Sequence, residues 1–330
     1  MSNYLQKGLI EVEDLTVRLS NGFVAVDSVS FGIERGEILA LVGESGCGKT
    51  LTALSLLNGV PPDVGASSAS RLELDGCELT GLDGGHLRAV RGGRISMIFQ
   101  DASAALDPLF TIGSQIVETI CAHNRNISGS AARQHALSVL EDVELKEPDS
   151  FFARYPHELS GGQRQRAMIA MALSTGPELL IADEPTTALD VTVQRQVLDL
   201  LASLSRERGL ALLLITHNLA LVASLAGRVL IMYAGQIVES AAVEDFFRFR
   251  DAAHPYSRAL LECIPRLDEK QREPATIPGN VPSPGNWPTG CRFRERCRFA
   301  CQGCERQQHL APVAGRPYRA VRCLLAGKRE

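Results

Sequence analysis

The feature that most constrains this chain is a glycine-rich loop that follows a continuous apolar run. Residues 38–42 (ILALV) are all apolar, which is typical of a strand buried on both faces of a sheet. The loop fits the pattern G-x-x-x-x-G-K-[ST] and comprises Gly43, Glu44, Ser45, Gly46, Cys47, Gly48, Lys49 and Thr50. Glycines let successive backbone N–H groups turn toward phosphate oxygens, and the helix that begins at Lys49 adds a favourable partial charge. The loop therefore predicts a nucleotide-binding site.

The last two residues of the loop predict how a nucleotide is held. Lys49 supplies a positive charge for the β- and γ-phosphates, and the Thr50 hydroxyl can ligate Mg²⁺. We therefore expect a nucleoside triphosphate with Mg²⁺ as the ligand. The loop alone does not indicate what the energy of this nucleotide is used for.

Another apolar run ends in two carboxylates. Residues 179–182 (LLIA) predict a buried strand, and Asp183 and Glu184 follow directly. Asp183 suits Mg²⁺ binding, directly or through water, and Glu184 suits polarising the water that attacks the γ-phosphate. A strand end followed by a helix cap would show the same two residues, so the pair is ambiguous by itself.

Two further apolar runs carry a polar side chain at their carboxyl end. His217 follows residues 212–216, and a contact to the γ-phosphate stands beside a purely structural interpretation. Gln100 follows residues 95–99 and could place the attacking water or complete the Mg²⁺ coordination. Sheets of this kind bind ligands at the carboxyl ends of their strands. We therefore expect Gln100, Glu184 and His217 at the same sheet edge as the phosphate loop.

The rest of the pattern predicts an α/β fold. Residues 9–33 alternate apolar and polar, which predicts antiparallel strands with a turn at 20–22. Residues 115–150 have helical periodicity, and we expect a core stripe of Ile116, Ile120, Ala136, Val139 and Leu140. Alternating strands and helices predict a mostly parallel sheet covered by helices. A composition break near Pro265 marks a Pro-rich C-terminal region without helical periodicity.

A second phosphate-binding surface is predicted at Leu159-Ser160-Gly161-Gly162-Gln163. Ser-Gly-Gly precedes a helical run (residues 163–173), so free backbone N–H groups are expected at the start of another helix. The two surfaces lie far apart along the chain and need not meet on one nucleotide. Two chains facing head to tail could bring them together.

In combination these motifs resemble the ATP-binding-cassette (ABC) family over about residues 9–240. In family order they are the Walker A loop at 43–50, the glutamine loop at Gln100, the signature at 159–163, Walker B ending at Asp183-Glu184, the D-loop Ala188-Leu189-Asp190 and the switch His217. The resemblance implies a P-loop NTPase ABC cassette: a mostly parallel sheet covered by helices, an antiparallel β subdomain and a helical subdomain. It also implies ATP hydrolysis by Glu184, His217, Gln100 and Lys49, with Mg²⁺ held through Thr50, Gln100 and Asp183.

The resemblance further implies a nucleotide-driven dimer. Ser160 and Gly162 would contact the γ-phosphate of ATP held by the opposite subunit, with Gly161 and Gln163 completing that surface, and Asp190 would link the two sites. The family stacks adenine on an aromatic residue near position 19, where this chain has Leu19. Phe23 is a possible substitute for that aromatic residue, or a residue that packs the turn.

Residues 254–261 (HPYSRALL), with Ile264-Pro265, Ile277-Pro278-Gly279 and Pro288-x-Gly290-Cys291, resemble ATPases of the dipeptide/oligopeptide permease group. That group includes relatives that import nickel, metallophores or opines. We expect a nucleotide-binding domain over residues 1–235, with its helical subdomain at about 101–175, and a small accessory region over 236–330. The resemblance implies uptake of di- or oligopeptides, with nickel, metallophore or opine import as the alternative.

Five of the nine cysteines lie in the last 40 residues. The group's pattern maps onto Cys291, Cys297, Cys304 and Cys323, which are taken there to hold a [4Fe–4S] cluster. Four thiolates on a short Pro-rich segment suit such a cluster, structural zinc, or thiols that simply pack a small subdomain. Cys301 leaves the ligand set ambiguous. The scattered Cys47, Cys77, Cys121 and Cys263 are expected to be buried or semi-buried free thiols.

The resemblance implies several partners: a second, homologous but non-identical ATPase, two transmembrane permease subunits and an extracytoplasmic solute-binding protein. Coupling to the permease is expected through residues 107–111 and 155–158. The sequence shows no signal peptide and no membrane span, so we expect a peripheral subunit on the cytoplasmic face of the cell membrane. A net charge of −4 gives no bulk case for nucleic-acid binding. A single cassette without a long coiled coil argues against a soluble, non-transport ABC ATPase.

Overall fold

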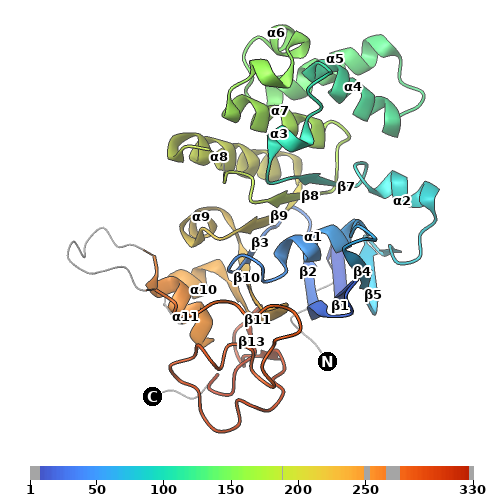
Figure 1. The fold of residues 1–330 in the computed structure, drawn as a ribbon. Helices are drawn as coiled ribbons and strands as arrows, with labels where there is room; N and C mark the ends of the chain where they lie inside the picture. The colour runs from blue at the N-terminus through green and yellow to red at the C-terminus, as the bar shows by residue number, and fades with distance from the viewer. Residues whose placement is uncertain (1–7, 188, 249–252, 265–275, 327–330) are drawn as a thin grey trace. The chain divides into compact units, whose positions relative to one another are not determined.

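The computed structural model describes residues 8–187, 189–248, 253–264 and 276–326 (Figure 1). Ala188 of the D-loop and Pro265 therefore lie outside the described residues. The chain divides into two compact units. The first, called here the phosphate-loop unit, comprises Met1–Glu34, Ile38–Thr80 and Ile215–Glu330; the second, the helical unit, comprises Arg35–Glu37 and Gly81–Leu214.

An antiparallel sheet at the start of the phosphate-loop unit confirms the alternating pattern of residues 9–33. Strands β1 (Ile10–Leu19) and β2 (Val24–Ile33) pair with Ile10 opposite Ile33 and Val12 opposite Phe31. The strand order is β2-β1-β5-β6, and β4 also pairs with β1. The remaining strands of this sheet are β4 (Gly65–Ser68), β5 (Arg71–Leu74) and β6 (Cys77–Glu78).

The strand before the phosphate loop pairs with one much later in the chain. β3 (Ile38–Val42) and β10 (Arg228–Tyr233) are parallel, with Leu39 opposite Arg228 and Val42 opposite Ile231, and both strands are buried throughout. β10 continues into the antiparallel β11 (Gln236–Ala242), which pairs with β13 (Ala320–Val321) and so brings the end of the chain onto the sheet. The other elements of this unit are α1 (Lys49–Leu56), α9 (Leu219–Leu225), α10 (Val243–Arg248), α11 (Pro255–Glu262) and β12 (Ala311–Pro312).

The helical unit contains short parallel strands and a group of packed helices. β7 (Ile95–Ile98) and β8 (Leu179–Asp183) are parallel, and residues 211–214 of β9 (Ala211–Thr216) lie beside β8. All five residues of the expected core stripe are buried, so that prediction is confirmed. In Figure 1, α4 to α7 lie together. The helices are α2 (Gly84–Val90), α3 (Ala102–Ala105), α4 (Ile112–His123), α5 (Gly129–Asp142), α6 (Pro148–Ala153), α7 (Gly161–Leu173) and α8 (Val191–Arg208).

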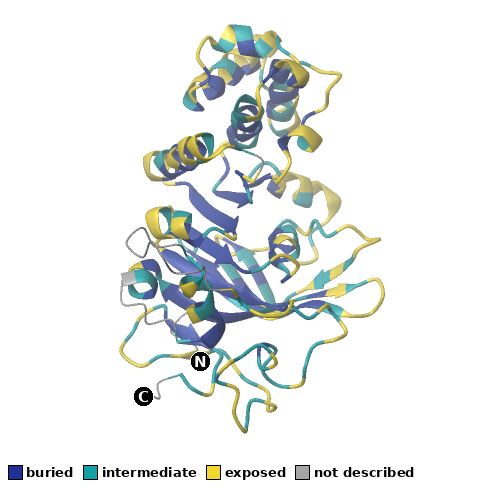
Figure 2. Cartoon of the chain, turned by 60° about the vertical axis from the view of Figure 1, so that its left-hand side comes forward, coloured by how far each residue is buried: buried dark blue, intermediate teal, exposed yellow. Residues whose placement is uncertain are grey.

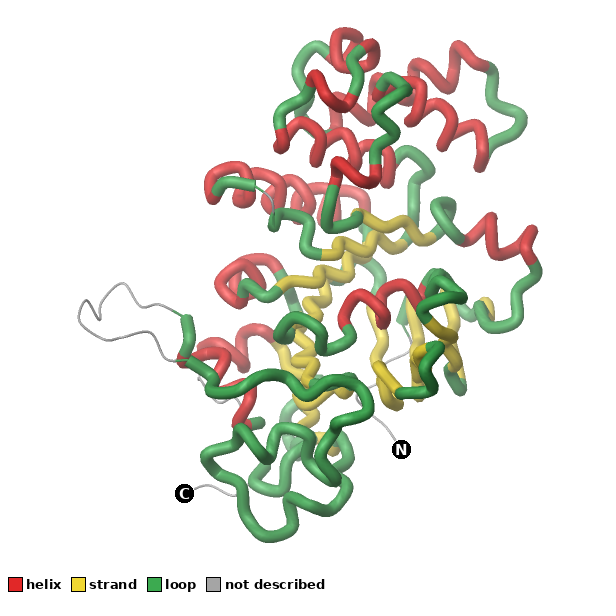
Figure 3. The backbone as a smooth tube through the Cα atoms, in the orientation of Figure 1, coloured by secondary structure: helices red, strands yellow, loops and turns green. Residues whose placement is uncertain are grey.

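The described part of the C-terminal region is mostly loop, as Figure 3 shows. It is nevertheless attached to a core, because Phe293 is buried against Tyr233 and Tyr256, with ring centroids 5.2 and 5.3 Å away. In Figure 2 the fully buried strands, such as β3 and β10, are dark blue, whereas this loop region is mostly intermediate or exposed. A few buried side chains therefore hold a segment that has little core of its own.

One buried ion pair joins the end of the chain to β11. The side chains of Glu239 and Arg319 are 0% and 2% exposed, and Nη2 of Arg319 lies 3.1 Å from Oε1 of Glu239. Glu239 also accepts hydrogen bonds from the backbone N–H groups of Ala253 and His254. One carboxylate thus ties β11, the start of α11 and the segment before β13 together.

Removing the positive partner of this pair is expected to destabilise the phosphate-loop unit. In Arg319→Met the carboxylate of Glu239 stays buried without its counter-charge, which costs about 3–5 kcal/mol in the free energy of unfolding. Urea denaturation followed by circular dichroism measures this change. Arg298→Met is the matched control, because Arg298 and Glu262 form an exposed pair (62% and 46% exposed) that contributes less than about 1 kcal/mol. Equal losses in the two variants would contradict the prediction.

Candidate nucleotide-binding site

The phosphate loop has the backbone conformation that its glycines allow. Gly46 and Gly48 adopt φ angles of +76° and +109°, which residues with a side chain rarely reach. A Cβ on Gly43 would lie 2.3 Å from the Met232 carbonyl oxygen at the end of β10. The loop therefore leaves β3 close against β10, and these positions require glycine.

Lys49 is buried and turned toward its own loop. Its ammonium donates hydrogen bonds to the carbonyl oxygens of Gly43 and Glu44 at 2.8 and 3.0 Å, and its side chain lies on the first turn of α1. Ser45, Gly46 and Thr50 are exposed along the same loop. A compact loop that carries a lysine ammonium and has a solvent-exposed middle is suited to bind phosphate oxygens.

Two residues outside the motif hold Glu44, and a contact of either with the phosphate loop was not predicted from the sequence. The backbone N–H of Glu44 donates to the hydroxyl of Tyr256 at 3.0 Å, and its carboxylate is paired with Arg296. Burial raises the pKa of Tyr256, so the phenol stays protonated at neutral pH. Both partners come from the C-terminal region, more than 200 residues further along the chain.

His217 belongs to the same unit as the phosphate loop. It directly follows β9, is exposed, and precedes Asn218, whose side chain caps α9 by accepting from the N–H of Ala220. The strand end expected from the apolar run is therefore confirmed. The contact of His217 to a γ-phosphate stays a prediction.

In the helical unit, the glutamine and the glutamate expected at the site lie together. Ile98 of β7 is opposite Ala182 of β8, so Gln100 and Glu184 each follow this register pair by two residues. Nε2 of Gln100 lies 3.4 Å from Oε2 of Glu184, and the Thr187 hydroxyl donates to the same oxygen at 2.9 Å. Glu184 itself has φ +46°, an unusual conformation that is common at functional sites. Asp183, at the end of β8, is buried.

The signature residues form the start of α7. The Ser160 hydroxyl accepts from the N–H of Gln163, and the Gln163 side chain accepts from the N–H of Ser160, which is a capping box. The expectation of free N–H groups is therefore wrong for Gln163, whose N–H is already bonded. Those of Gly161 and Gly162 have no acceptor within the helix, because they belong to its first turn. Asp190 is likewise a helix cap and accepts from the N–H of Val193 at the start of α8.

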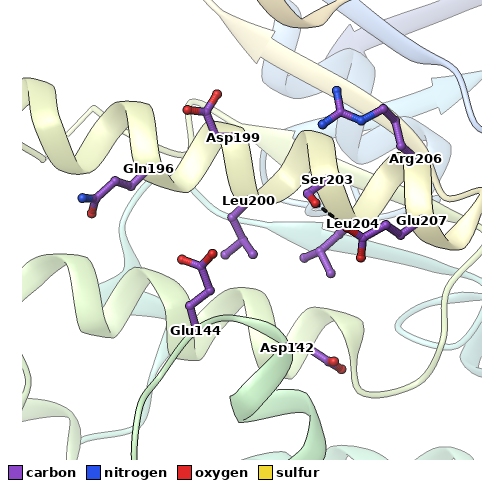
Figure 4. A pocket seen from close by; sticks show the side chains of 9 residues that line it. All are labelled: Asp142, Glu144, Gln196, Asp199, Leu200, Ser203, Leu204, Arg206 and Glu207. Atoms are coloured by element: carbon purple, nitrogen blue, oxygen red, sulfur yellow. Dashed lines mark hydrogen bonds between the residues drawn. The ribbon is translucent and has the colours of Figure 1, made fainter.

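A pocket of about 480 Å³ in the helical unit does not coincide with any of these motifs (Figure 4). It lies between α8 and the end of α5, where Ser203 donates to Glu207 and Asp142 pairs with Arg208. Its lining consists of Asp142, Glu144, Gln196, Asp199, Leu200, Ser203, Leu204, Arg206 and Glu207. Since no predicted site residue lines it, we assign it no part in nucleotide binding.

The cysteines of the C-terminal region approach one another without forming a closed ligand set. The N–H of Cys291 donates to the Cys304 carbonyl, and the sulfurs of Cys301 and Cys304 are 3.9 Å apart. Burial, and then the neighbouring thiols, raises the pKa of Cys291 to about 11 and raises those of Cys297 and Cys323. Within the described residues, no group of three or more His, Cys, Asp or Glu side chains is arranged to hold a metal ion. A bound cation would favour thiolates at this position.

The four scattered cysteines only partly fit the expectation. Cys47 is buried, and Cys121 and Cys263 are half-buried. Cys77 is exposed, so the prediction is wrong there, because β6 is a two-residue edge strand with both residues exposed.

Among the helices that the structure describes, none has the length and apolar character that a membrane-spanning segment needs.

Two family profiles match the chain: "ABC transporter" over residues 26–187 and "Oligopeptide/dipeptide transporter, C-terminal region" over residues 238–304. The oligopeptide transport ATP-binding protein AppD of Bacillus subtilis is 43% identical over 320 residues, which are 96% of each chain. The probable peptide ABC transporter ATP-binding protein y4tR of Sinorhizobium fredii is 46% identical over 91% of this chain and 88% of its own.

Solved structures with this fold include a dimeric bacterial ABC transporter cassette, MJ0796. It is 28% identical, with a TM-score of 0.62, and the match covers 71% of this chain and 98% of that one. The cassette cbiO1 from Clostridium perfringens, at 24% identity and a TM-score of 0.64, supports the fold alone. The class defined by fold and site is the P-loop ABC cassette, as predicted. The chain belongs to the family of ABC transporter ATP-binding proteins that carry the oligopeptide/dipeptide transporter C-terminal region.

Replacing Gly48 by alanine is expected to weaken ATP binding about fivefold or more, since backbone strain of about 1–3 kcal/mol would fall on the loop. The new Cβ would also lie 2.8 Å from Met232 Cε and 3.2 Å from the Ala25 carbonyl oxygen. Titration with a fluorescent ATP analogue measures the change. Gly76→Ala is the matched control, because Gly76 also has positive φ (+75°) but open space around it, in the turn between β5 and β6. Unchanged affinity in Gly48→Ala would show that the loop does not bind the phosphates.

Proposed function

We propose that this chain drives the uptake of di- or oligopeptides as the ATP-hydrolysing subunit of an ABC importer. The chain is an ABC-type ATPase. The observation that supports peptides as the transported solute is the family match of its C-terminal extension. This extension matches the oligopeptide/dipeptide region, and relatives named as peptide transporters align over nearly the whole chain, at 43–46% identity. Nickel chelates, metallophores and opines are the alternative cargo.

In this proposal each motif has one role in hydrolysis. The loop from Gly43 to Thr50 binds the phosphates, and Lys49 neutralises charge on the β- and γ-phosphates. Thr50, Asp183 and Gln100 would hold Mg²⁺. Glu184 orients and polarises the attacking water, with its carboxylate held by the Thr187 hydroxyl at 2.9 Å. His217 contacts the γ-phosphate.

We further propose that two such ATPases close on ATP and that the second is a homologous, non-identical chain. Ser160, Gly161 and Gly162 then present the first turn of α7 to the γ-phosphate bound by the partner. Asp190, which caps α8 in this chain, would link the two sites. A solved ABC transporter cassette that is 28% identical is described as dimeric, which supports pairing but not the identity of the partner.

The permease is proposed to bind the exposed apolar side chains between β7 and α7. Leu109 and Phe110 are 78% and 54% exposed, and Tyr155 is 39% exposed. These residues fall within the two segments expected to couple hydrolysis to transport. Two permease subunits and an extracytoplasmic binding protein complete the assembly, with this chain peripheral on the cytoplasmic face of the membrane.

We also propose that the nucleotide-binding domain comprises residues 1–235 and the accessory region residues 236–330.

Glu184→Gln is expected to abolish turnover while preserving ATP binding. Loss of the carboxylate should lower the ATPase rate at least about 100-fold in the assembled transporter, because general-base assistance is lost. Peptide uptake into vesicles should fall in parallel. Glu207→Gln serves as control, since Glu207 lies on the exposed face of α8. Full ATPase activity in Glu184→Gln would overturn the catalytic assignment, and transport of a nickel chelate or opine in place of peptide would overturn the cargo.

We propose that Cys291, Cys297, Cys304 and Cys323 hold a [4Fe–4S] cluster, with structural zinc as the alternative. Burial, and then the charge of neighbouring thiols, raises the pKa of Cys291, Cys297 and Cys323, and a Cys₄ set suits such a cluster. When bound, the group would supply cross-links to a segment with little hydrophobic core.

Anaerobic purification distinguishes the two ligands. A brown protein with visible absorbance, and iron and sulfide in equal amounts, is expected for the wild type. Cys297→Ser should lose this absorbance, whereas Cys77→Ser, which changes an exposed thiol of β6, should retain it. Stoichiometric zinc without iron would refute the cluster, and a protein free of both metals would refute the metal centre.

A further inference from the structure

The Arg296 side chain is buried and makes a full set of hydrogen bonds. It is 7% exposed, and an arginine has five N–H donors. Nη1 and Nη2 each donate to one oxygen of the Glu44 carboxylate at 3.0 Å, which is a bidentate pair. The remaining donors bond the Pro278 carbonyl at 2.7 Å, the Tyr233 hydroxyl at 3.3 Å and the Ile277 carbonyl at 3.3 Å. This geometry fixes the guanidinium on the phosphate loop.

Glu44 connects this guanidinium to the lysine of the motif. Its carbonyl oxygen accepts from the Lys49 ammonium at 3.0 Å, its N–H donates to Tyr256, and its carboxylate holds Arg296. Every polar group of Glu44 is thus engaged, two of them by the C-terminal region. A displacement of Arg296 would act directly on the residue that orients Lys49.

The segment that carries Arg296 is held rigidly. Between Cys291 and Cys297 the chain makes consecutive turns, with backbone hydrogen bonds from Arg294 to Cys291 and from Arg296 to Phe293. Phe293 is buried in the aromatic core with Tyr233 and Tyr256. The other buried cation of the segment, Arg292, pairs with Asp27 of β2 and stacks on the Trp287 ring at 3.4 Å. The turn is therefore anchored by the residues that directly precede Arg296.

The charge of Glu44 gives this contact a role in ligand binding. A carboxylate in a loop that receives polyphosphate repels the ligand, because the repulsion between like charges is weakened less by solvent in a partly buried site than in open water. The Glu44 side chain is 29% exposed and so is only partly screened by water. The bidentate guanidinium of Arg296 cancels this charge.

We propose that Arg296 is a positioning residue for ATP binding: from the cysteine-rich segment, it neutralises and orients Glu44 so that the phosphate loop accepts ATP. The segment thereby sets the ATP affinity of this chain without contacting the nucleotide. This inference rests on the proposed function of the phosphate loop, and it adds a control of that loop by the C-terminal region.

The test compares four purified full-length variants with the wild type by titration with a fluorescent ATP analogue. Arg296→Gln leaves Glu44 unpaired and is expected to raise the dissociation constant about 5- to 10-fold. Glu44→Gln removes the repelling charge, so the double variant Arg296→Gln/Glu44→Gln should return to within about twofold of the wild type. Arg298→Gln is the control from the same segment, since its side chain is exposed and pairs with Glu262. It should stay within about twofold of the wild type.

Rescue by the second substitution separates charge neutralisation from a structural role. A variant that merely unfolds the segment would bind no better after Glu44 is also replaced, so a double variant as weak as Arg296→Gln would overturn the proposal. The proposal also fails if Arg296→Gln binds as tightly as Arg298→Gln. Arg296→Lys, which keeps the charge but loses the bidentate geometry, should bind between the wild type and Arg296→Gln. Failure of the wild type itself to bind nucleotide would instead contradict the proposed function.

Discussion

The parallel pairing of β3 with β10 is the constraint on which the site depends. It joins the strand before the phosphate loop to one that arrives nearly 200 residues later, and it places Gly43 against the carbonyl of Met232. β10 leads through a tight turn into β11, and two described residues that follow, Tyr256 and Arg296, contact Glu44 of the phosphate loop. The contact between Glu44 and Arg296 is a consequence of this strand order.

Most of the fold and the separate motifs could be predicted because they depend on local patterns. The run at 38–42, the glycines of the loop and the alternation in β1 and β2 each encode their own conformation, and each prediction was confirmed. The proximity of Gln100 to Glu184 was predictable too, since both follow paired parallel strands. Family and fold followed from the order of the motifs.

Contacts between distant segments could not be predicted in the same way. Nothing in the pattern of residues 291–298 distinguishes Arg296, which is buried on the phosphate loop, from Arg298, which is exposed. The difference arises from the turns that the segment makes and from the burial of Phe293. Likewise the capping box of Ser160 and Gln163 uses an N–H group that the motif alone presents as free. In both cases tertiary or local geometry decides which polar groups remain available to a ligand.

The buried pair of Glu239 and Arg319 fixes the segment before β13 to β11, which is continuous with the strand beside the phosphate loop. A shortened chain that stops before Arg319 would keep every motif of the cassette, yet it would lose β13 from the edge of β11 and leave a buried carboxylate with amide donors only. Removing only the cysteine-bearing loops and rejoining the chain ahead of Arg319 would keep that pair intact. The region is thus attached to β11 near its far end, and an internal deletion should disturb the pairing of β11 less than a truncation, although it would remove the contact between Arg296 and Glu44.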